Sequence, residues 1–199
     1  MNAPLPRFNA PLARIGPNSV LQLVPLLDER LGTGPREMLL AQAGLSELPA
    51  EEGLMEEQPA ARLHQAVRAL YPDMAEELTR RAGLRTADYI VSHRIPPLVL
   101  HLLQNAPPWL SAPLLARTIE KHAWTFAGSG RFRVASRRPL VFELLDNPVV
   151  RGESAAAPIC HWHSAVFQRL FNALVDKDMT CRETACCAMG SDRCRFELE

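Results

Sequence analysis

Four side chains of metal-ligand type lie in the last 40 residues of the chain: Cys160, Glu183, Cys186 and Cys194. Zinc in proteins prefers four tetrahedral ligands, favouring thiolates and accepting carboxylates. A turn expected at residues 190–192 would bring Cys186 and Cys194 together across a hairpin, while Cys160 would approach from the start of a helix. The residue types are therefore compatible with one bound zinc ion.

The spacing of these residues leaves the ligand set open. Side chains alternate between the two faces of a regular strand, so Glu183 and Cys186 point to opposite faces unless the strand bulges or ends between them. Other potential ligands nearby in the sequence are Cys181, Cys187, His161 and His163. The alternative interpretation involves no metal, because reduced cysteines also pack in protein cores as small apolar residues.

A second group of residues could bind an apolar ligand. His122 precedes Trp124 and Phe126, which would form an apolar wall beside the imidazole. The histidine could instead pack in the core or in an interface. Arg131 and Arg133 follow on an expected strand. They would either protect an exposed strand edge or pair with the carboxylates of a ligand.

Helical patterns dominate the first two thirds of the chain, because apolar residues recur at every third or fourth position and glycines follow them. We expect helices over residues 17–31, 35–43, 59–70, 73–92 and 111–127, with a short helix between the proline pairs at 96–97 and 107–108. Pro25 should kink the first of these helices, and Gly83 is a potential break in the fourth.

The pattern changes in the last third of the chain. Alternating residues predict strands over 131–135 and 140–144, an amphipathic helix over 161–176, and strands over 178–188 and 192–198. A helical part followed by the order β-β-α-β-β predicts an α+β fold with an antiparallel sheet.

The same patterns predict the domain organisation. Residues 1–16 should form an irregular N-terminal arm, and residues 17–199 a single domain, a size that suits one hydrophobic core. Within that domain we expect a helical part over 17–128 and a part over 129–199 that contains the sheet and the zinc site.

Composition and the N-terminal sequence exclude several classes of protein. The chain has 22 Lys and Arg residues against 22 Asp and Glu, so its charge does not indicate a nucleic-acid partner. We expect no signal peptide, because no basic region precedes an apolar one, and no transmembrane helix, because five prolines interrupt the apolar segment 95–115. The expected location is the cytoplasm, with at most peripheral membrane contact and with cysteines that are reduced or bound to metal.

The motifs identify the chain as similar to the vinyl-4-reductase domain family. The resemblance extends from residue 13 over almost the whole chain. It is carried by ARIGPN at 13–18, TADYI at 86–90, HRIP at 93–96, HAWTFAGSG at 122–130, NP at 147–148, CHWHSAVF at 160–167, CCAMG at 186–190 and CRF at 194–196.

The resemblance implies a fold similar to the ligand-binding domains of nitric-oxide-signalling and Golgi-transport proteins. Such domains are commonly dimeric through their helices and have an apolar pocket between helices and sheet. Similar domains in phenol-sensing regulators bind a structural zinc through a Cys, then a Glu, a Cys and a Cys. Cys160, Glu183, Cys186 and Cys194 match that order.

The resemblance also implies a role in bacteriochlorophyll synthesis, at the divinyl-to-monovinyl stage of a magnesium tetrapyrrole. Reducing a vinyl group requires a hydride or electrons from a cofactor, and the chain has neither a GxGxxG motif after a strand nor a GxxxxGK[ST] motif. We therefore favour a protein that binds a Mg-porphyrin or chlorophyllide intermediate and delivers it to the pathway enzymes. The alternatives are a 4-vinyl (8-vinyl) reductase, a pigment-sensing regulatory domain and a structural scaffold.

In the favoured interpretation the second group of residues has specific roles. Trp124 and Phe126 would contact the macrocycle, and His122 would be an axial nitrogen ligand to magnesium, with His161 and His163 as the alternative ligands. Arg131 or Arg133 would pair with a propionate.

The N-terminal apolar stripe predicts a homodimer. It consists of Val20, Leu23, Leu27 and Leu31, and its spacing is that of a helix face that meets a partner. Packing of this stripe within the chain is the alternative.

Overall fold

The computed structural model describes residues 13–199. Its helices are α1 (Asn18–Leu21), α2 (Val24–Leu31), α3 (Thr33–Ala43), α4 (Glu57–Leu70), α5 (Pro72–His93), α6 (Pro97–Asn105), α7 (Pro108–Lys121) and α8 (His161–Leu174). Three 3-10 turns are η1 (Ala123–Thr125), η2 (Pro148–Val150) and η3 (Cys187–Met189). The strands are β1 (Arg14–Ile15), β2 (Met55–Glu56), β3 (Arg131–Arg137), β4 (Leu140–Leu145), β5 (Cys181–Ala185) and β6 (Arg193–Leu198).

The last four strands form one antiparallel sheet in the order β3-β4-β6-β5. Strands β3 and β4 are consecutive, whereas α8 intervenes before β5 and β6, so the predicted β-β-α-β-β order is confirmed. Together with the helical N-terminal part, this sheet confirms the predicted α+β class.

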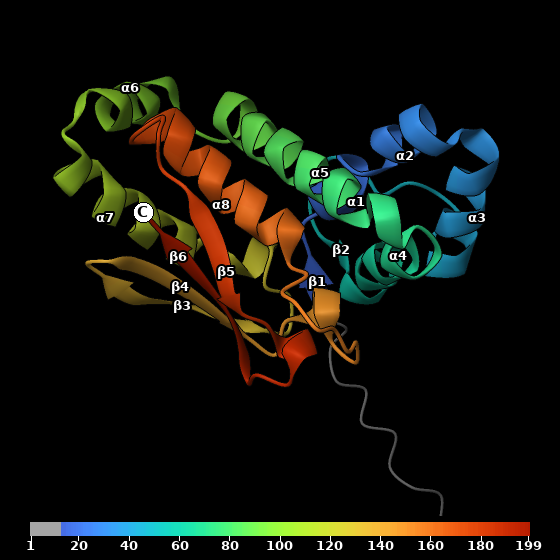
Figure 1. Cartoon of the computed structure of the whole chain (residues 1–199). Helices are drawn as coiled ribbons and strands as arrows, with labels where there is room; N and C mark the ends of the chain where they lie inside the picture. Colours follow the sequence, from blue (N-terminus) through green and yellow to red (C-terminus); the bar gives the residue numbers. More distant parts are fainter. Residues whose placement is uncertain (1–12) are drawn as a thin grey trace, which may run out of the picture.

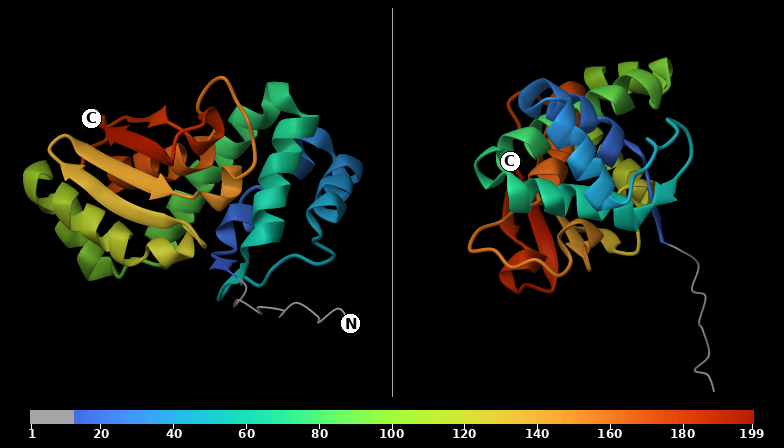
Figure 2. Two further views of the ribbon diagram at one scale, coloured as in Figure 1. Left: turned by 90° about the horizontal axis from the view of Figure 1, so that it is seen from below. Right: turned by 90° about the vertical axis from the view of Figure 1, so that its right-hand side faces the viewer.

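The molecule is layered around α8 (Figure 1). Helix α8 packs on the inner face of the sheet and against α5 along its other side. Figures 1 and 2 show α1 to α4 at one end of the molecule and α6 and α7 at the opposite end. The core between these layers is built from large buried side chains, among them Phe142, Phe167, Phe171 and Phe196. No helix within residues 13–199 has both the length and the apolar composition needed to cross a membrane.

Two predictions for the N-terminal part need correction. The irregular arm expected over residues 1–16 extends too far, because Arg14–Ile15 pairs with Met55–Glu56 and Ile15 is buried; residues 1–12 lie outside the described part. The stripe expected to mediate a dimer is also unsuitable. Val20, Leu23 and Leu27 have 0% exposure within this one chain, so they stabilise its own core. The homodimer stays a prediction without an assigned surface.

Gly83 does not break α5 but allows α5 and α8 to approach closely. A Cβ atom at residue 83 would clash with the Trp162 carbonyl oxygen and would lie 2.8 Å from the Cβ of Ala165. The sequence pattern indicates a weak point in the helix, whereas the structure shows a packing requirement.

We therefore expect Gly83→Ala to destabilise the fold by about 1–3 kcal/mol, the usual cost of overpacking a core. Denaturant unfolding followed by circular dichroism would measure this. Gly34→Ala is the matched control, since its Cβ would meet nothing within 4 Å and alanine favours the helix. Equal stability of the two variants would contradict the packing role.

Candidate metal centre and ligand cavity

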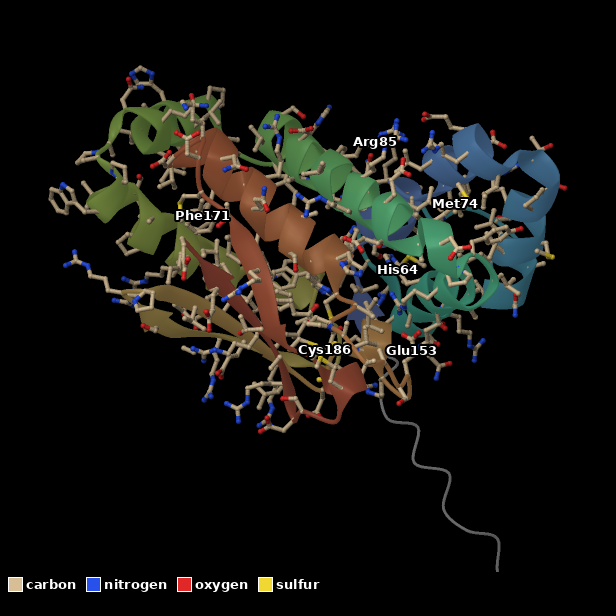
Figure 3. All side chains as sticks on the ribbon, in the orientation of Figure 1. His64, Met74, Arg85, Glu153, Phe171 and Cys186 are labelled. Carbon is tan, nitrogen blue, oxygen red and sulfur yellow. The ribbon has the colours of Figure 1, made fainter. Side chains whose placement is uncertain are left out.

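The structure brings Cys160, Glu183, Cys186 and Cys194 together at one end of the sheet. One potential ligand atom from each residue lies within 4.8 Å of those from the other three. Cys160 immediately precedes α8, Glu183 lies in β5, Cys186 follows the end of β5, and Cys194 lies in β6. Figure 3 labels Cys186 in this region, beside the N-terminal end of α8.

The end of β5 resolves the opposite-face problem of Glu183 and Cys186. The pairing of β5 with β6 shifts register between Glu183 and Ala185, and β5 ends at Ala185. This bulge turns the next side chain toward the same side as Glu183. The condition stated from the sequence, a bulge or strand end between the two residues, is therefore met.

The three sulfur atoms form a compact triangle. The Sγ atoms of Cys160 and Cys186 are 3.8 Å apart, those of Cys186 and Cys194 are 3.9 Å apart, and those of Cys160 and Cys194 are 3.3 Å apart. The Glu183 carboxylate completes the group, since its Oε2 accepts a hydrogen bond of 2.7 Å from the Cys160 backbone N–H. Such a donor set can hold a metal ion.

Two members of the cluster, Glu183 and Cys160, have raised pKa values because they are buried. Oε1 of Glu183 is buried and has no hydrogen-bond partner among the described residues. Burial, followed by the nearby Cys186 sulfur, raises the pKa of the Glu183 carboxyl to about 8. Burial also raises the pKa of the Cys160 thiol well above its usual value. A cation at this position would stabilise the deprotonated ligands and give the orphaned oxygen a partner.

The other potential ligands take different positions. The group formed among residues 13–199 includes none of Cys181, Cys187, His161 and His163. Cys187 donates only its backbone N–H to the Cys194 sulfur, at 3.4 Å. His163 is buried among aromatic rings, among them Phe126 and Phe196.

Asn147 is a part of this centre that the sequence pattern did not reveal. Its buried amide donates hydrogen bonds to the sulfurs of Cys160 and Cys194, at 3.2 and 3.5 Å. Donors of this kind stabilise thiolate charge and orient metal ligands. The NP motif at 147–148 is one of the motifs that carry the family resemblance, but it does not indicate that Asn147 contacts the cysteines.

A cavity of about 520 Å³ lies between α5, α7, α8 and the segment before α1. His122, Trp124 and Phe126 all line it. Most of the remaining lining is apolar, and it includes Ile90, Leu115, Ile119, Trp162, Val166, Phe167 and Leu170. The volume and lining are those of pockets that hold small organic ligands.

His122 has one ring nitrogen engaged and one available. Its Nδ1 lies 2.8 Å from the Thr118 carbonyl oxygen, which can only accept, so this nitrogen carries the proton. The proton on Nδ1 leaves the lone pair of Nε2 available for a metal. His122 itself is exposed at the cavity rim, immediately after the end of α7.

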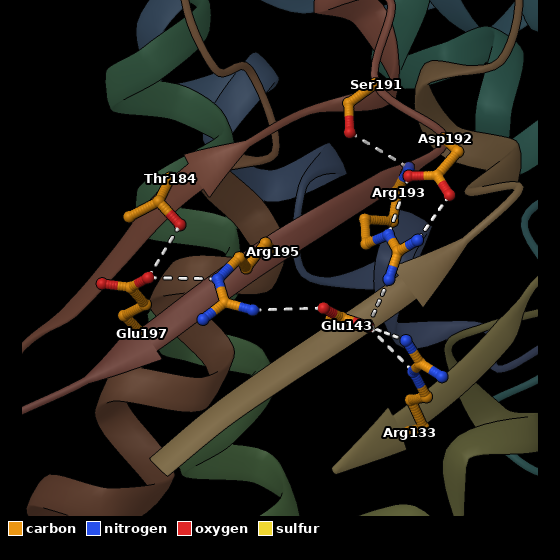
Figure 4. A network of polar contacts seen from close by, with 8 residues as sticks. All are labelled: Arg133, Glu143, Thr184, Ser191, Asp192, Arg193, Arg195 and Glu197. Atoms are coloured by element: carbon orange, nitrogen blue, oxygen red, sulfur yellow. Dashed lines mark hydrogen bonds and ion pairs between the residues drawn. The ribbon is translucent and has the colours of Figure 1, made fainter. Parts of the chain in front are cut away.

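Arg131 and Arg133 are not among the lining residues of the cavity, so the structure does not support their predicted contact with a ligand propionate. Both alternate with inward-facing residues of β3 and lie on the outer face of the sheet. Figure 4 shows that Arg133, Arg193 and Arg195 surround the buried carboxylate of Glu143. Arg133 is therefore part of a structural network on the solvent side of the sheet.

Arg94 is the guanidinium that lines the cavity, and its sequence position had given it no predicted role. It follows the end of α5, where its side chain stacks 5.6 Å from the centre of the Tyr89 ring and donates to the Tyr89 hydroxyl at 3.3 Å. Among the described lining residues, Arg94 and His122 are the two with titratable side chains. The cavity thus combines apolar walls with one cation and one imidazole.

Comparison with known proteins gives the same assignment as the motifs. The family model of the vinyl-4-reductase domain matches residues 140–199, which contain all four cluster residues. The Bacteriochlorophyll synthase 23 kDa chain of Cereibacter sphaeroides is 52% identical over 185 residues, which cover 93% of this chain and 90% of that protein. The chain belongs to the vinyl-4-reductase domain family. The protein of the same name from Rhodobacter capsulatus is 43% identical, over 98% of this chain and 91% of that protein.

Solved structures share the fold of this vinyl-4-reductase domain protein. An H-NOX protein from K. algicida superposes with a TM-score of 0.57 at 13% identity, covering 93% of this chain and 96% of that one. The phenol-responsive sensory domain of the transcription activator PoxR gives a TM-score of 0.54 at 15% identity, covering 83% and 90%. At such identities the likeness concerns the fold alone, and it confirms the predicted similarity of fold to nitric-oxide-signalling domains.

Proposed function

We propose that this member of the vinyl-4-reductase domain family acts in bacteriochlorophyll biosynthesis by binding a magnesium tetrapyrrole in the cavity and delivering it to pathway enzymes. The apolar cavity, with the imidazole of His122 among its lining residues, is the observation that carries this proposal. Two relatives covering nearly the whole chain are named as chains of bacteriochlorophyll synthase, which supports both the pathway and the pathway enzymes as partners. H-NOX proteins, which share the fold, are described as containing heme, another tetrapyrrole.

The lining residues suggest how such a ring would be held. Trp124 and Phe126 offer aromatic contacts, and burial of the flat macrocycle would supply most of the affinity. Nε2 of His122 would coordinate the magnesium ion of the bound ring as an axial ligand. Arg94 replaces Arg131 and Arg133 as the candidate partner of a propionate.

A turnover assay separates the carrier from the alternative, a 4-vinyl reductase. Purified protein would be incubated with a divinyl chlorophyllide and NADPH, with no other protein present. A carrier should bind the pigment without converting it. Formation of the monovinyl product by the protein alone would overturn the carrier proposal and support the enzyme.

We further propose that Cys160, Glu183, Cys186 and Cys194 hold one structural zinc ion. Tetrahedral zinc with Zn–S bonds of about 2.3 Å places its sulfur ligands about 3.8 Å apart. Two of the three sulfur pairs lie at 3.8 and 3.9 Å, which supports this geometry. Four protein ligands would leave no open position for substrate, which indicates a structural role. Because Cys160 precedes α8 and the other three ligands lie in or beside β5 and β6, the ion would connect α8 to the sheet.

Replacing His122 by alanine should change the spectrum of the bound pigment more than its affinity. The variant loses the axial nitrogen, whereas the apolar walls that supply most of the binding remain. We therefore expect a Soret band at a different wavelength and an affinity lowered by about tenfold or less, equivalent to about 1.4 kcal/mol. Absorbance titration with a Mg-porphyrin would measure both. An unchanged Soret band would exclude the axial role and keep the cavity.

A further inference from the structure

Helices α6 and α7 carry an exposed apolar face at one end of the molecule. The exposed fractions are 71% for Leu98, 58% for Leu102, 66% for Trp109, 48% for Leu110 and 51% for Leu114. Leu98 and Leu102 are one turn apart in α6, and Leu110 and Leu114 are one turn apart in α7. Large exposed side chains gathered on two consecutive helices mark an interaction surface.

Basic side chains border this face in the sequence of α7 and in a neighbouring turn. Residues 95–119 contain neither Asp nor Glu, and the exposed side chains of Arg117 and Lys121 border the face in α7. Glu120, also in α7, is engaged, because its carboxylate accepts the Val134 backbone N–H at 2.9 Å. Figures 1 and 2 show the turn between β3 and β4, with exposed Arg137 and Arg138, at the same end of the molecule as α6 and α7.

We propose that the α6–α7 face docks on the surface of an anionic lipid bilayer. The leucines would enter the boundary between headgroups and acyl chains, and Trp109 would lie at headgroup level, where tryptophan is enriched. Arg117, Lys121 and the arginines of the β3–β4 turn would attract anionic headgroups. The two helices have 9 and 14 residues, so they would lie on the surface.

The charge distribution favours lipid over a second copy of the chain. Two copies meeting through this face would bring the basic borders together without acidic side chains from residues 95–119 to pair with them. An anionic surface supplies the missing counter-charge.

Docking would also place the cavity close to the lipid. Leu115 and Ile119 of α7 line the cavity, while Leu110 and Leu114 of the same helix belong to the exposed face. An apolar ligand could then pass between bilayer and cavity with little exposure to water. The docking itself does not depend on which ligand the cavity binds.

Vesicle flotation tests the proposal with the full chain and no pigment. We expect binding to vesicles of phosphatidylcholine with phosphatidylglycerol, weaker binding at high salt, and little binding to phosphatidylcholine alone. The double variant Leu102→Ser, Leu110→Ser should reduce binding at least tenfold. Leu48→Ser, which changes a leucine of similar exposure (49%) in another part of the chain, should leave it unchanged.

Two results would overturn the proposal. One is a failure of the wild-type protein to bind the anionic vesicles, or equal binding of these vesicles by the wild type and the double variant. The other is a wild-type dimer in sedimentation that becomes monomeric in the double variant without any vesicle binding, since the face would then join two copies. Circular dichroism of the variants should match the wild type, because the changed side chains are exposed.

Discussion

Cys194→Ser should cause loss of bound metal and a fall in the free energy of unfolding of about 3–5 kcal/mol, the cost of leaving buried charge without its partner. Cys194 lies at 0% exposure near the start of β6, an inner strand of the sheet, opposite Leu144 of β4. Its sulfur joins the start of α8 to the end of β5 through Cys160 and Cys186. Metal binding at such a site is coupled to folding, so removing one ligand weakens both.

Denaturant unfolding and metal analysis of purified protein would measure these effects. The wild type should contain about one zinc ion per chain, the ratio that a single four-ligand site requires. Chelation of wild-type zinc should lower the unfolding midpoint toward that of Cys194→Ser. Cys187→Ser is the matched control, because its side chain is half-buried and lies outside the cluster. A larger effect for Cys187→Ser, or a metal-free wild type of undiminished stability, would contradict the zinc assignment.

The order of helices and strands could be predicted because the period of the apolar residues changes between the two parts of the chain. The repeat in residues 161–176 predicted α8 closely, and it ends at Leu174. The apolar stripe of Val20, Leu23 and Leu27 was equally clear, but a stripe does not reveal whether it meets the same chain or another. Here it meets the chain's own core.

The metal cluster could be predicted by residue type but not by spacing. Whether Glu183 and Cys186 converge depends on a register shift between β5 and β6, which is set by the tertiary pairing of the two strands. The contacts of Asn147 could not be predicted for the same reason. Its partners Cys160 and Cys194 are 13 and 47 residues away in the sequence, and tertiary structure alone brings them together.

The cavity was predicted in part. His122, Trp124 and Phe126 form a local motif, so their common location follows from their closeness in the chain. The position of Arg131 and Arg133 depends on which face of β3 carries them. They lie on the face where Arg133 pairs with the buried carboxylate of Glu143, away from the cavity. Arg94 reaches the cavity because α5 ends there, a fact of helix packing.

Ile90→Trp should abolish most pigment binding while the fold persists. Ile90 lines the cavity from α5 and is half-buried, so an indole at this residue would occupy space that the macrocycle requires. We expect the affinity for a Mg-porphyrin to fall at least about tenfold, because a filled cavity loses buried contact area. Ser92→Trp is the matched control: it adds the same side chain to the same helix at an exposed residue outside the cavity.

Titration of the wild-type protein with a Mg-porphyrin tests the binding proposal most directly. Trp124 and Trp162 line the cavity, so their fluorescence should be quenched as the ring enters. We expect saturation at about one ring per chain, as for a single cavity, and a shifted Soret band. Both signals should be lost in Ile90→Trp but not in Ser92→Trp. Quenching that rises linearly without saturation, or that is the same in Ile90→Trp, would contradict a tetrapyrrole site in this cavity.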